Sequence, residues 1–247
     1  NWMLKRDYVL ILLAPILCLL VIFVFFSSST VATSLKLPDL TKKVEPEKKV
    51  IVLNVPYVSE APDGNWTGSW INACEESSIT MVHRFYQGES TTTIAESKEF
   101  MTLLFNEQKK LYKSDMNSNS ERTLGLIKKF ADFDGEIVTD PTIDSIKNEI
   151  KNGRPVISLH YGVDLQNPNV PFKPTGSAFH VIVVVGFNDE TQQFITHDNG
   201  DTKDGINHAY SYDIFMNSLH DYNHKTYKSD GPARVIFTSP KDTLRTS

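Results

Sequence analysis

Residues 180–198, HVIVVVGFNDETQQFITHD, contain two runs of β-branched and aromatic residues separated by a polar segment. We predict strands over 180–187 and 194–197 that pair as an antiparallel hairpin across that segment. The far ends of such strands meet, so His180 and Asp198 are expected to be neighbours. An imidazole oriented by a carboxylate is a candidate general base. The plainer interpretation is an edge-strand histidine and a turn-forming aspartate.

The chain around this hairpin predicts helices first and antiparallel strands later. Apolar spacing predicts helices over 74–86, 94–111, 123–130, 143–151 and 212–219. Runs of β-branched residues predict further strands over 50–58, 155–161 and 233–238. This order indicates an α+β domain over residues 50–240, with helices packed on an antiparallel sheet.

Composition excludes several classes of protein. Of the 247 residues, 40% are hydrophobic and 11% aromatic, which excludes a disordered or low-complexity chain. The net charge of −5 argues against nucleic acid as a partner, because binders of nucleic acid usually carry a basic surface. Two cysteines are too few for a disulfide framework or a four-thiolate zinc site.

The N-terminal region predicts a membrane anchor. Residues 8–26, YVLILLAPILCLLVIFVFF, contain no charge, and a helix of this length would be about 28 Å long, close to the thickness of the hydrocarbon core. Lys5 and Arg6 lie just before it, which places residues 1–7 in the cytoplasm and the rest of the chain on the extracytoplasmic side. The membrane is therefore an expected partner, through a single-pass helix.

An alternative is a signal peptide that is cleaved, which would leave a secreted protein. The small residues from Ser27 to Ser34 could contain a cleavage site. Residues 27–49 are polar and charged and predict a tether, and residues 241–247 predict a C-terminal tail. Cys18 falls inside the apolar run.

Cys74 is the one cysteine outside the apolar segment. It begins the helix predicted over 74–86, and a helix N-terminus stabilises a thiolate. The plainer interpretation is a small buried hydrophobe. Glu75 and Glu76 follow it, and we expect them to interact favourably with the helix dipole, although they could also repel a nearby thiolate.

Neither a metal site nor a cofactor is expected from the histidines near the C-terminus. His197, His208, His220 and His224 show no compact spacing with a third ligand, apart from the last two at i, i+4. The residues between those two do not form the HExxH pattern of zinc peptidases.

Several segments together resemble the peptidase C39-like group of papain-like cysteine peptidases. They are NVPYVSEAPDGNW (54–66), WINACEESSITMVHRFY (70–86), NGRPVISLHYG (152–162), FHVIVVVGFND (179–189) and FITHDNGD (194–201). The resemblance implies a papain-like fold. It also implies that Cys74 is the nucleophile, His180 the general base and Asp198 the residue that orients the base.

The sequence departs from this family at the oxyanion hole. The family has a glutamine shortly before the cysteine, and Glu60 occupies its place in VSEAP. An ionised carboxylate donates no hydrogen bond, so Asn72 or the backbone N–H of Cys74 could substitute for it. A second departure is Asn199, where the family commonly has proline after the aspartate.

These observations predict a membrane-anchored, extracytoplasmic cysteine peptidase that hydrolyses peptide or protein substrates through Cys74, His180 and Asp198. Glu60 motivates one alternative, a binding module that kept the fold and lost efficient catalysis. A related acyl transferase or amidase is another, because the three residues do not decide whether water or an amine accepts the acyl group.

Overall fold

The computed structural model of the protein describes residues 48–114, 116–174 and 177–241. The predicted anchor at 8–26, with Cys18, lies outside the described residues, as does nearly all of the predicted tether and tail. Within the described part of the chain, no helix combines the length and apolar character needed to cross a membrane.

The described residues form an antiparallel sheet whose strand order is β2-β7-β3-β4-β5-β6, with β1 paired to β4 outside this order. The strands are β1 (Val50–Val52), β2 (Phe133–Thr139), β3 (Val156–Tyr161), β4 (Phe179–Asn188), β5 (Gln193–His197), β6 (His208–Ser211) and β7 (Arg234–Pro240). The predicted hairpin is present, because β4 and β5 pair with Val183 opposite His197.

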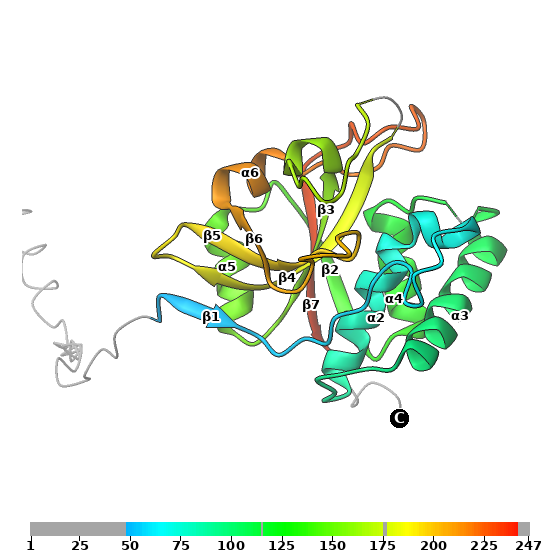
Figure 1. Ribbon diagram of the computed structural model, residues 1–247, viewed down its shortest axis with the longest axis horizontal. Helices are drawn as coiled ribbons and strands as arrows, with labels where there is room; N and C mark the ends of the chain where they lie inside the picture. The colour runs from blue at the N-terminus through cyan, green and yellow to red at the C-terminus, as the bar shows by residue number, and fades with distance from the viewer. Residues whose placement is uncertain (1–47, 115, 175–176, 242–247) are drawn as a thin grey trace, which may run out of the picture. The chain divides into compact units, whose positions relative to one another are not determined.

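Helices cover both faces of this sheet. They are η1 (Gly68–Asn72), α2 (Cys74–Tyr86), α3 (Ile94–Tyr112), α4 (Ser120–Phe130), α5 (Ile143–Lys151), η2 (Gly162–Leu165) and α6 (Tyr212–Asn217). Figure 1 shows α2, α3 and α4 on one side of the sheet and α5 and α6 on the other. The predicted α+β class, with helices packed on an antiparallel sheet, is confirmed.

The central strand β4 is apolar on both faces because both faces are covered. Val181, Val183 and Val185 pack into the core beneath α2, whereas Ile182 and Val184 pack into the core beneath α5 and α6. This double burial explains the unbroken apolar run in the sequence, since a strand with one solvated face would alternate.

Helix α2 begins at Cys74, as the sequence predicts, and short polar contacts attach its first turn to the sheet. Ser78 Oγ donates to the carbonyl of Val181 at 3.1 Å, and Ser77 Oγ donates to the carbonyl of Val58 at 2.7 Å. Both hydroxyls lie within the first two turns, so the start of the helix is held at a defined place beside β4.

Some predicted boundaries are wrong. The strand expected over 50–58 ends at Val52, because only residues 50–52 pair with β4 and Pro56 has no N–H to donate to a ladder. The helix expected over 212–219 ends at Asn217. Strands β2 and β6 were not predicted. Their sequences, FDGEIVT and HAYS, lack a sustained apolar alternation.

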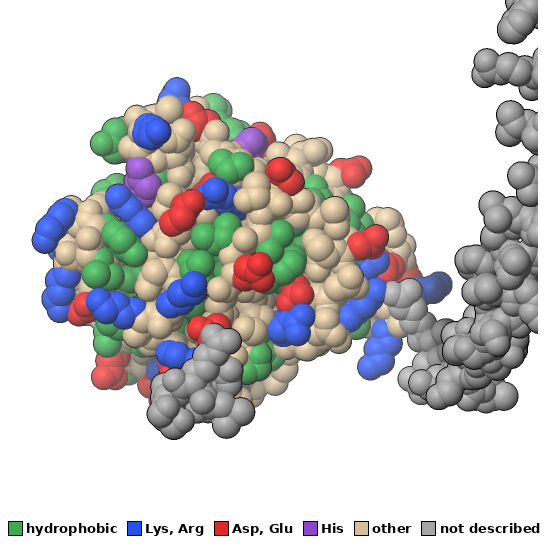
Figure 2. Space-filling model, turned by 180° about the vertical axis from the view of Figure 1, so that it is seen from behind, with side chains coloured by type: hydrophobic (Ala, Val, Ile, Leu, Met, Phe, Trp, Pro, Cys, Tyr) green, Lys and Arg blue, Asp and Glu red, His purple; other side chains and the backbone are tan. Residues whose placement is uncertain are grey.

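The surface in Figure 2 carries a mixture of charges. Lys and Arg side chains are interspersed with Asp and Glu side chains and with apolar ones over the face of the folded unit that this view presents. This face therefore has no extended field of a single sign that would attract a highly charged partner.

Candidate active site

His180 and Asp198 lie together at the end of the β4–β5 hairpin. His180 is the second residue of β4, and Asp198 directly follows β5. The Nε2 atom of His180 lies 2.8 Å from Oδ1 of Asp198, and both side chains are almost completely buried. The antiparallel register produces this contact, since it returns the chain to the level where β4 began.

Cys74 lies on the other side of His180, at the start of α2. Its thiol, a ring nitrogen of His180 and a carboxylate oxygen of Glu60 all lie within 4.8 Å of one another. Cys74 is only 2% exposed. The Sγ atom donates to Oε2 of Glu75 at 3.0 Å, so Glu75, rather than His180, accepts the hydrogen bond of the thiol in this structure.

Asn199 joins the elements that carry these residues. Its Nδ2 atom donates to the backbone carbonyl of Cys74 at 2.9 Å and to that of Val181 at 3.0 Å. It also contacts Ser78 Oγ at 3.1 Å. The amide therefore fixes the start of α2 against β4, a role that the proline common at this position in the family could not perform.

A network of polar side chains holds Asp198. Its Oδ2 atom accepts from the hydroxyl of Tyr210 at 2.5 Å and from Nδ2 of Asn167 at 3.0 Å. Its Oδ1 atom accepts from the backbone N–H of Gly200 at 3.2 Å, in addition to the contact with His180. Every lone-pair direction of the carboxylate is thus occupied by a defined partner.

This network determines the charges of the pair. Burial raises the pKa of Asp198, but the attraction and hydrogen bond of His180 outweigh it, so the pKa lies below its ordinary value. Burial lowers the pKa of His180, and Asp198 together with Glu60 more than offsets this, so that pKa is raised. Asp198 is therefore ionised and only accepts, which makes Nε2 of His180 the donor.

The thiol of Cys74 behaves differently from what its place at a helix N-terminus predicts. Burial raises its pKa well above the ordinary value, and the nearby carboxyl groups of Glu75 and Glu60 raise it further. These effects outweigh the helix dipole. The resting group is a neutral thiol, and it must lose its proton to His180 during attack.

Glu60 faces the same space from the loop after β1. Its Oε1 atom lies 3.6 Å from Nδ1 of His180, and its side chain is 7% exposed. Burial raises its pKa to about 8, so at neutral pH the side chain is predominantly the uncharged acid, which can donate a hydrogen bond. Asn72 is the last residue of η1, two positions before Cys74, and is partly buried.

Two residues shape the space beside the His180 ring. The ring of Phe172 lies with its centroid 5.0 Å from that of His180. Gly200 lies on another side, where an added Cβ would be 3.1 Å from Cε1 of His180 and 3.3 Å from Oε1 of Glu60. A larger residue at position 200 would therefore crowd both groups.

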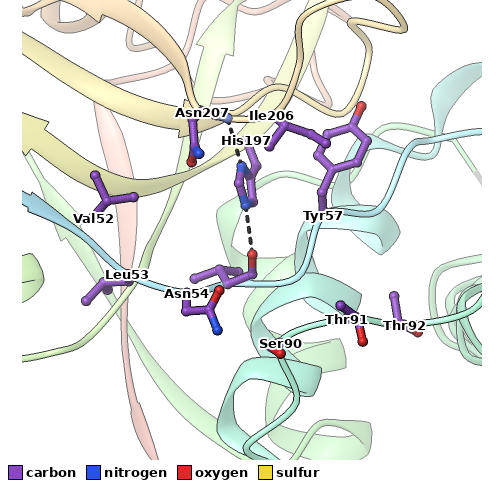
Figure 3. Close-up of a pocket in the computed structure, with 11 residues that line it drawn as sticks. Val52, Leu53, Asn54, Tyr57, Ser90, Thr91, Thr92, His197, Ile206 and Asn207 are labelled. Atoms are coloured by element: carbon purple, nitrogen blue, oxygen red, sulfur yellow. Dashed lines mark hydrogen bonds between the residues drawn. The ribbon is translucent and has the colours of Figure 1, made fainter.

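A separate cavity of about 480 Å³ lies near the site without including it (Figure 3). His197 spans it, donating from Nε2 to the carbonyl of Val55 at 2.9 Å and accepting at Nδ1 from the backbone N–H of Asn207 at 3.2 Å. Tyr57, also on its wall, donates to the carbonyl of Asp201 at 3.1 Å. Glu60, Cys74, His180 and Asp198 are not among the residues that line it.

Comparison with known proteins agrees with this geometry. The model of the Peptidase_C39 like family matches residues 52–229. The chain belongs to this family. The match includes Cys74, His180 and Asp198, and also Glu60. No curated protein sequence matches the chain.

Two solved structures resemble this C39-like chain in fold. A protein from Bacillus anthracis described as a C39-like peptidase superposes with a TM-score of 0.50 at 13% identity, covering 78% of this chain and 99% of that one. UfSP from C. elegans superposes with a TM-score of 0.42 at 10% identity, covering 82% of this chain and 36% of that one. At such identities, the first likeness concerns the fold alone.

Several site residues were not found from the sequence. Tyr210 and Asn167 reach Asp198 from segments whose sequence carries no motif for this role. Glu75 gave a signal, since it adjoins Cys74, but its position on a helix favoured a dipole role. The residues named from the sequence are brought together, except that no contact of the Asn72 side chain marks it as part of the cluster.

Proposed function

We propose that this C39-like protein is a cysteine peptidase in which Cys74 is the nucleophile, His180 the general base and Asp198 the residue that orients the base. The observation that carries the proposal is the position of His180. One ring nitrogen bonds to Asp198 at 2.8 Å, and the ring lies within 4.8 Å of both Cys74 and Glu60. A nucleophile, a base and an orienting carboxylate in this order are what acyl transfer requires.

The reaction follows from the protonation states. Because Nε2 of His180 donates to Asp198, Nδ1 carries the lone pair that accepts the thiol proton of Cys74. The sulfur attacks the peptide carbonyl, and the imidazolium then gives its proton to the leaving amine as the C–N bond breaks. A water molecule, deprotonated by His180, hydrolyses the resulting thioester and restores the thiol.

The neutral side chain of Glu60 serves as a donor to the oxyanion. A protonated carboxyl group offers one O–H, much as the amide of glutamine offers N–H. The backbone N–H of Cys74 and the side chain of Asn72 are further candidate donors. We expect Glu60→Ala to lower kcat by about 10²–10³-fold, the cost of losing one such donor, whereas Glu60→Gln keeps it within about threefold.

Kinetic constants of both variants, measured at neutral pH with a quenched fluorescent peptide, check this role. An unchanged kcat for Glu60→Ala would exclude Glu60 from the oxyanion hole. A large gain in Glu60→Gln would mean that the acid impairs a working site. A folded Glu60→Gln protein without activity would favour the alternative of a binding module, which the near-complete burial of Cys74 also favours.

Thiol labelling tests the proposed pair of Cys74 and His180. The full chain carrying Cys18→Ser has Cys74 as its single thiol. We expect iodoacetamide to alkylate Cys74 near neutral pH, and His180→Ala to slow this by about 10-fold or more, since a general base contributes about 10²–10⁴-fold to proton transfer. His220→Ala is the matched control. An unreactive Cys74, or equal rates in both variants, would contradict the proposal.

We also propose that residues 8–26 anchor the protein, with the peptidase domain on the extracytoplasmic side. The uncharged run and the positive charges before it support this orientation. In intact cells, an added protease should remove the domain while leaving cytoplasmic markers intact. Full release of the domain into the medium would instead support cleavage of a signal peptide.

A further inference from the structure

Glu60, Cys74 and His180 form a cluster whose donor atoms belong to the types that zinc prefers. Each residue offers one such atom, a carboxylate oxygen, a thiol sulfur or an imidazole nitrogen, and the three atoms lie within 4.8 Å of one another. We propose that this cluster binds a zinc ion, which occupies the nucleophile and the base and so inhibits the enzyme. The inhibition rests on the proposed peptidase function, whereas the binding does not.

The spacing of the three atoms suits a tetrahedral ion. With metal–ligand distances of about 2.0–2.3 Å, ligand atoms around zinc lie about 3.3–3.8 Å apart. Nδ1 of His180 and Oε1 of Glu60 already lie 3.6 Å apart. Rotations of the Cys74 and Glu60 side chains would bring the sulfur into the same range, and a water molecule would complete the fourth position.

The contact of His180 with Asp198 is the outer arrangement that a metal-binding histidine usually has. A histidine that binds a metal donates its other ring N–H to a carboxylate, which fixes the tautomer and the ring orientation. Here Nε2 makes that contact with Asp198 at 2.8 Å, and Nδ1 faces Glu60. The lone pair of Nδ1 is thus already directed toward the other two ligands.

Gly200 keeps one side of the cluster open. An added Cβ there would lie 3.1 Å from Cε1 of His180 and 3.3 Å from Oε1 of Glu60. The absence of a side chain therefore leaves these two ligands room to rotate toward a common centre.

Glu60 gives this chain a ligand that a glutamine would not supply. A carboxylate binds zinc at about 2.0–2.2 Å, whereas an uncharged amide is not among its usual ligands. On binding, Cys74 and Glu60 release their protons to solvent, and the two resulting negative charges neutralise the ion without any redox change. The same residue thus serves the proposed peptidase when protonated and the metal when ionised.

Glu75 provides a matched control for Glu60. It also adjoins the thiol of Cys74, at 3.0 Å, and is equally buried. Its other oxygen, Oε1, accepts from the backbone N–H of Ser118. Glu75 is therefore engaged by the α3–α4 connection, and Glu75→Gln leaves the three proposed ligands in place.

Cobalt binding tests the proposal without relying on activity. The probe is Co²⁺ alone, added to the metal-free full chain carrying Cys18→Ser, purified in detergent, and the readout is the near-ultraviolet thiolate-to-cobalt charge-transfer absorption. We expect one Co²⁺ per chain, displaced by Zn²⁺. Glu60→Gln should weaken binding by at least about 10-fold, and Glu75→Gln should leave it within about threefold. His180→Gln, a second ligand variant, should also weaken it, with folding checked by circular dichroism.

Three outcomes would overturn the site. They are the absence of a thiolate–cobalt band, equal affinity in the wild type and Glu60→Gln, or a loss in Glu75→Gln that Glu60→Gln does not share. Peptide hydrolysis is then assayed with Zn²⁺ and with a chelator. Zinc should inhibit the wild type at concentrations at least about 10-fold lower than Glu60→Gln. Binding in a protein that hydrolyses no peptide under either condition would contradict the peptidase but leave the metal site standing.

Discussion

At the scale of single residues, Asp198 is the most tightly held group of the site. Tyr210 and Asn167 bind one oxygen, at 2.5 and 3.0 Å, and the backbone of Gly200 and His180 bind the other. Hydrogen bonds to an ionised acceptor are about twice as strong as neutral ones. Tyr210 is therefore a positioning residue, which acts on the reaction through the orientation of Asp198.

Replacing Tyr210 by phenylalanine should lower kcat by about 10-fold and leave KM nearly unchanged, since one charge-assisted hydrogen bond is lost and Asn167 remains. Steady-state kinetics on a fluorogenic peptide check this. Tyr212→Phe is the matched control, because its hydroxyl donates to Asp189 at 2.8 Å, away from the site. Equal kcat values for the two variants would show that Tyr210 has no positioning role.

The pairing of His180 with Asp198 could be predicted from the sequence, because a short hairpin determines which strand ends meet. The roles of Asn199 and Glu75 could not, since they depend on where α2 lies against β4 and on the connection before α4. The direction of the Cys74 pKa shift was also beyond reach. It follows from burial and from the approach of Glu60, which lies 14 residues before it in the chain.

At the scale of elements, β4 connects the site to the rest of the sheet. It pairs with β1, β3 and β5, and a bulge near Gly186 accommodates β1 and β5 along the same strand. A Cβ on Gly186 would collide with the backbone carbonyl of Ile51. Glycine is therefore required here for the close approach of β1.

Gly186→Ala should lower the free energy of unfolding by about 1–3 kcal/mol, because a backbone carbonyl yields less readily than a side chain. Urea denaturation followed by circular dichroism measures it. Gly135→Ala in β2 is the control, since its Cβ would meet the side chains of Ile236 and Leu124, which can rotate. A smaller loss for Gly186→Ala than for Gly135→Ala would contradict this account of β1.

The elements that could be predicted are those with a strong period or a continuous apolar run. Helices α2 and α5 have the predicted bounds, and β4 and β5 match within a residue at each end. Strands β2 and β6 owe their pairing to neighbours far along the chain, β7 and β5, rather than to their own pattern. The extended segment after Val52 has strand-like composition but, beyond the contact of Leu53 with Val185, no continuing ladder.

At the scale of the whole molecule, the fold buries several titratable groups in their neutral form. His83 is one of these, stacked on Phe100 with ring centroids 4.1 Å apart, and its Nδ1 accepts from the backbone N–H of Asp132 at 3.0 Å. Burial lowers its pKa, and Asp132 only partly offsets this. The unfolded chain therefore gains a proton at His83 at a higher pH than the folded protein does.

Acidification should thus favour unfolding through His83. Below an unfolded pKa of about 6.5, this histidine costs up to about 1.4 kcal/mol of stability per pH unit until the folded pKa is reached. In urea titrations from pH 7.5 to 5, His83→Asn should gain stability relative to the wild type as the pH falls. Phe100→Leu should lose stability with little dependence on pH. A constant difference between His83→Asn and the wild type would contradict the assignment.

Peptide hydrolysis by the full chain is the most direct test of the central claim. Peptides from a digested proteome are incubated with the protein and a metal chelator, and new termini are identified by mass spectrometry. The account predicts cleavage by the wild type and a loss of about 10³-fold or more in both Cys74→Ala and His180→Ala. Cleavage by Cys74→Ala at the wild-type rate, or no cleavage by the wild type, would contradict it.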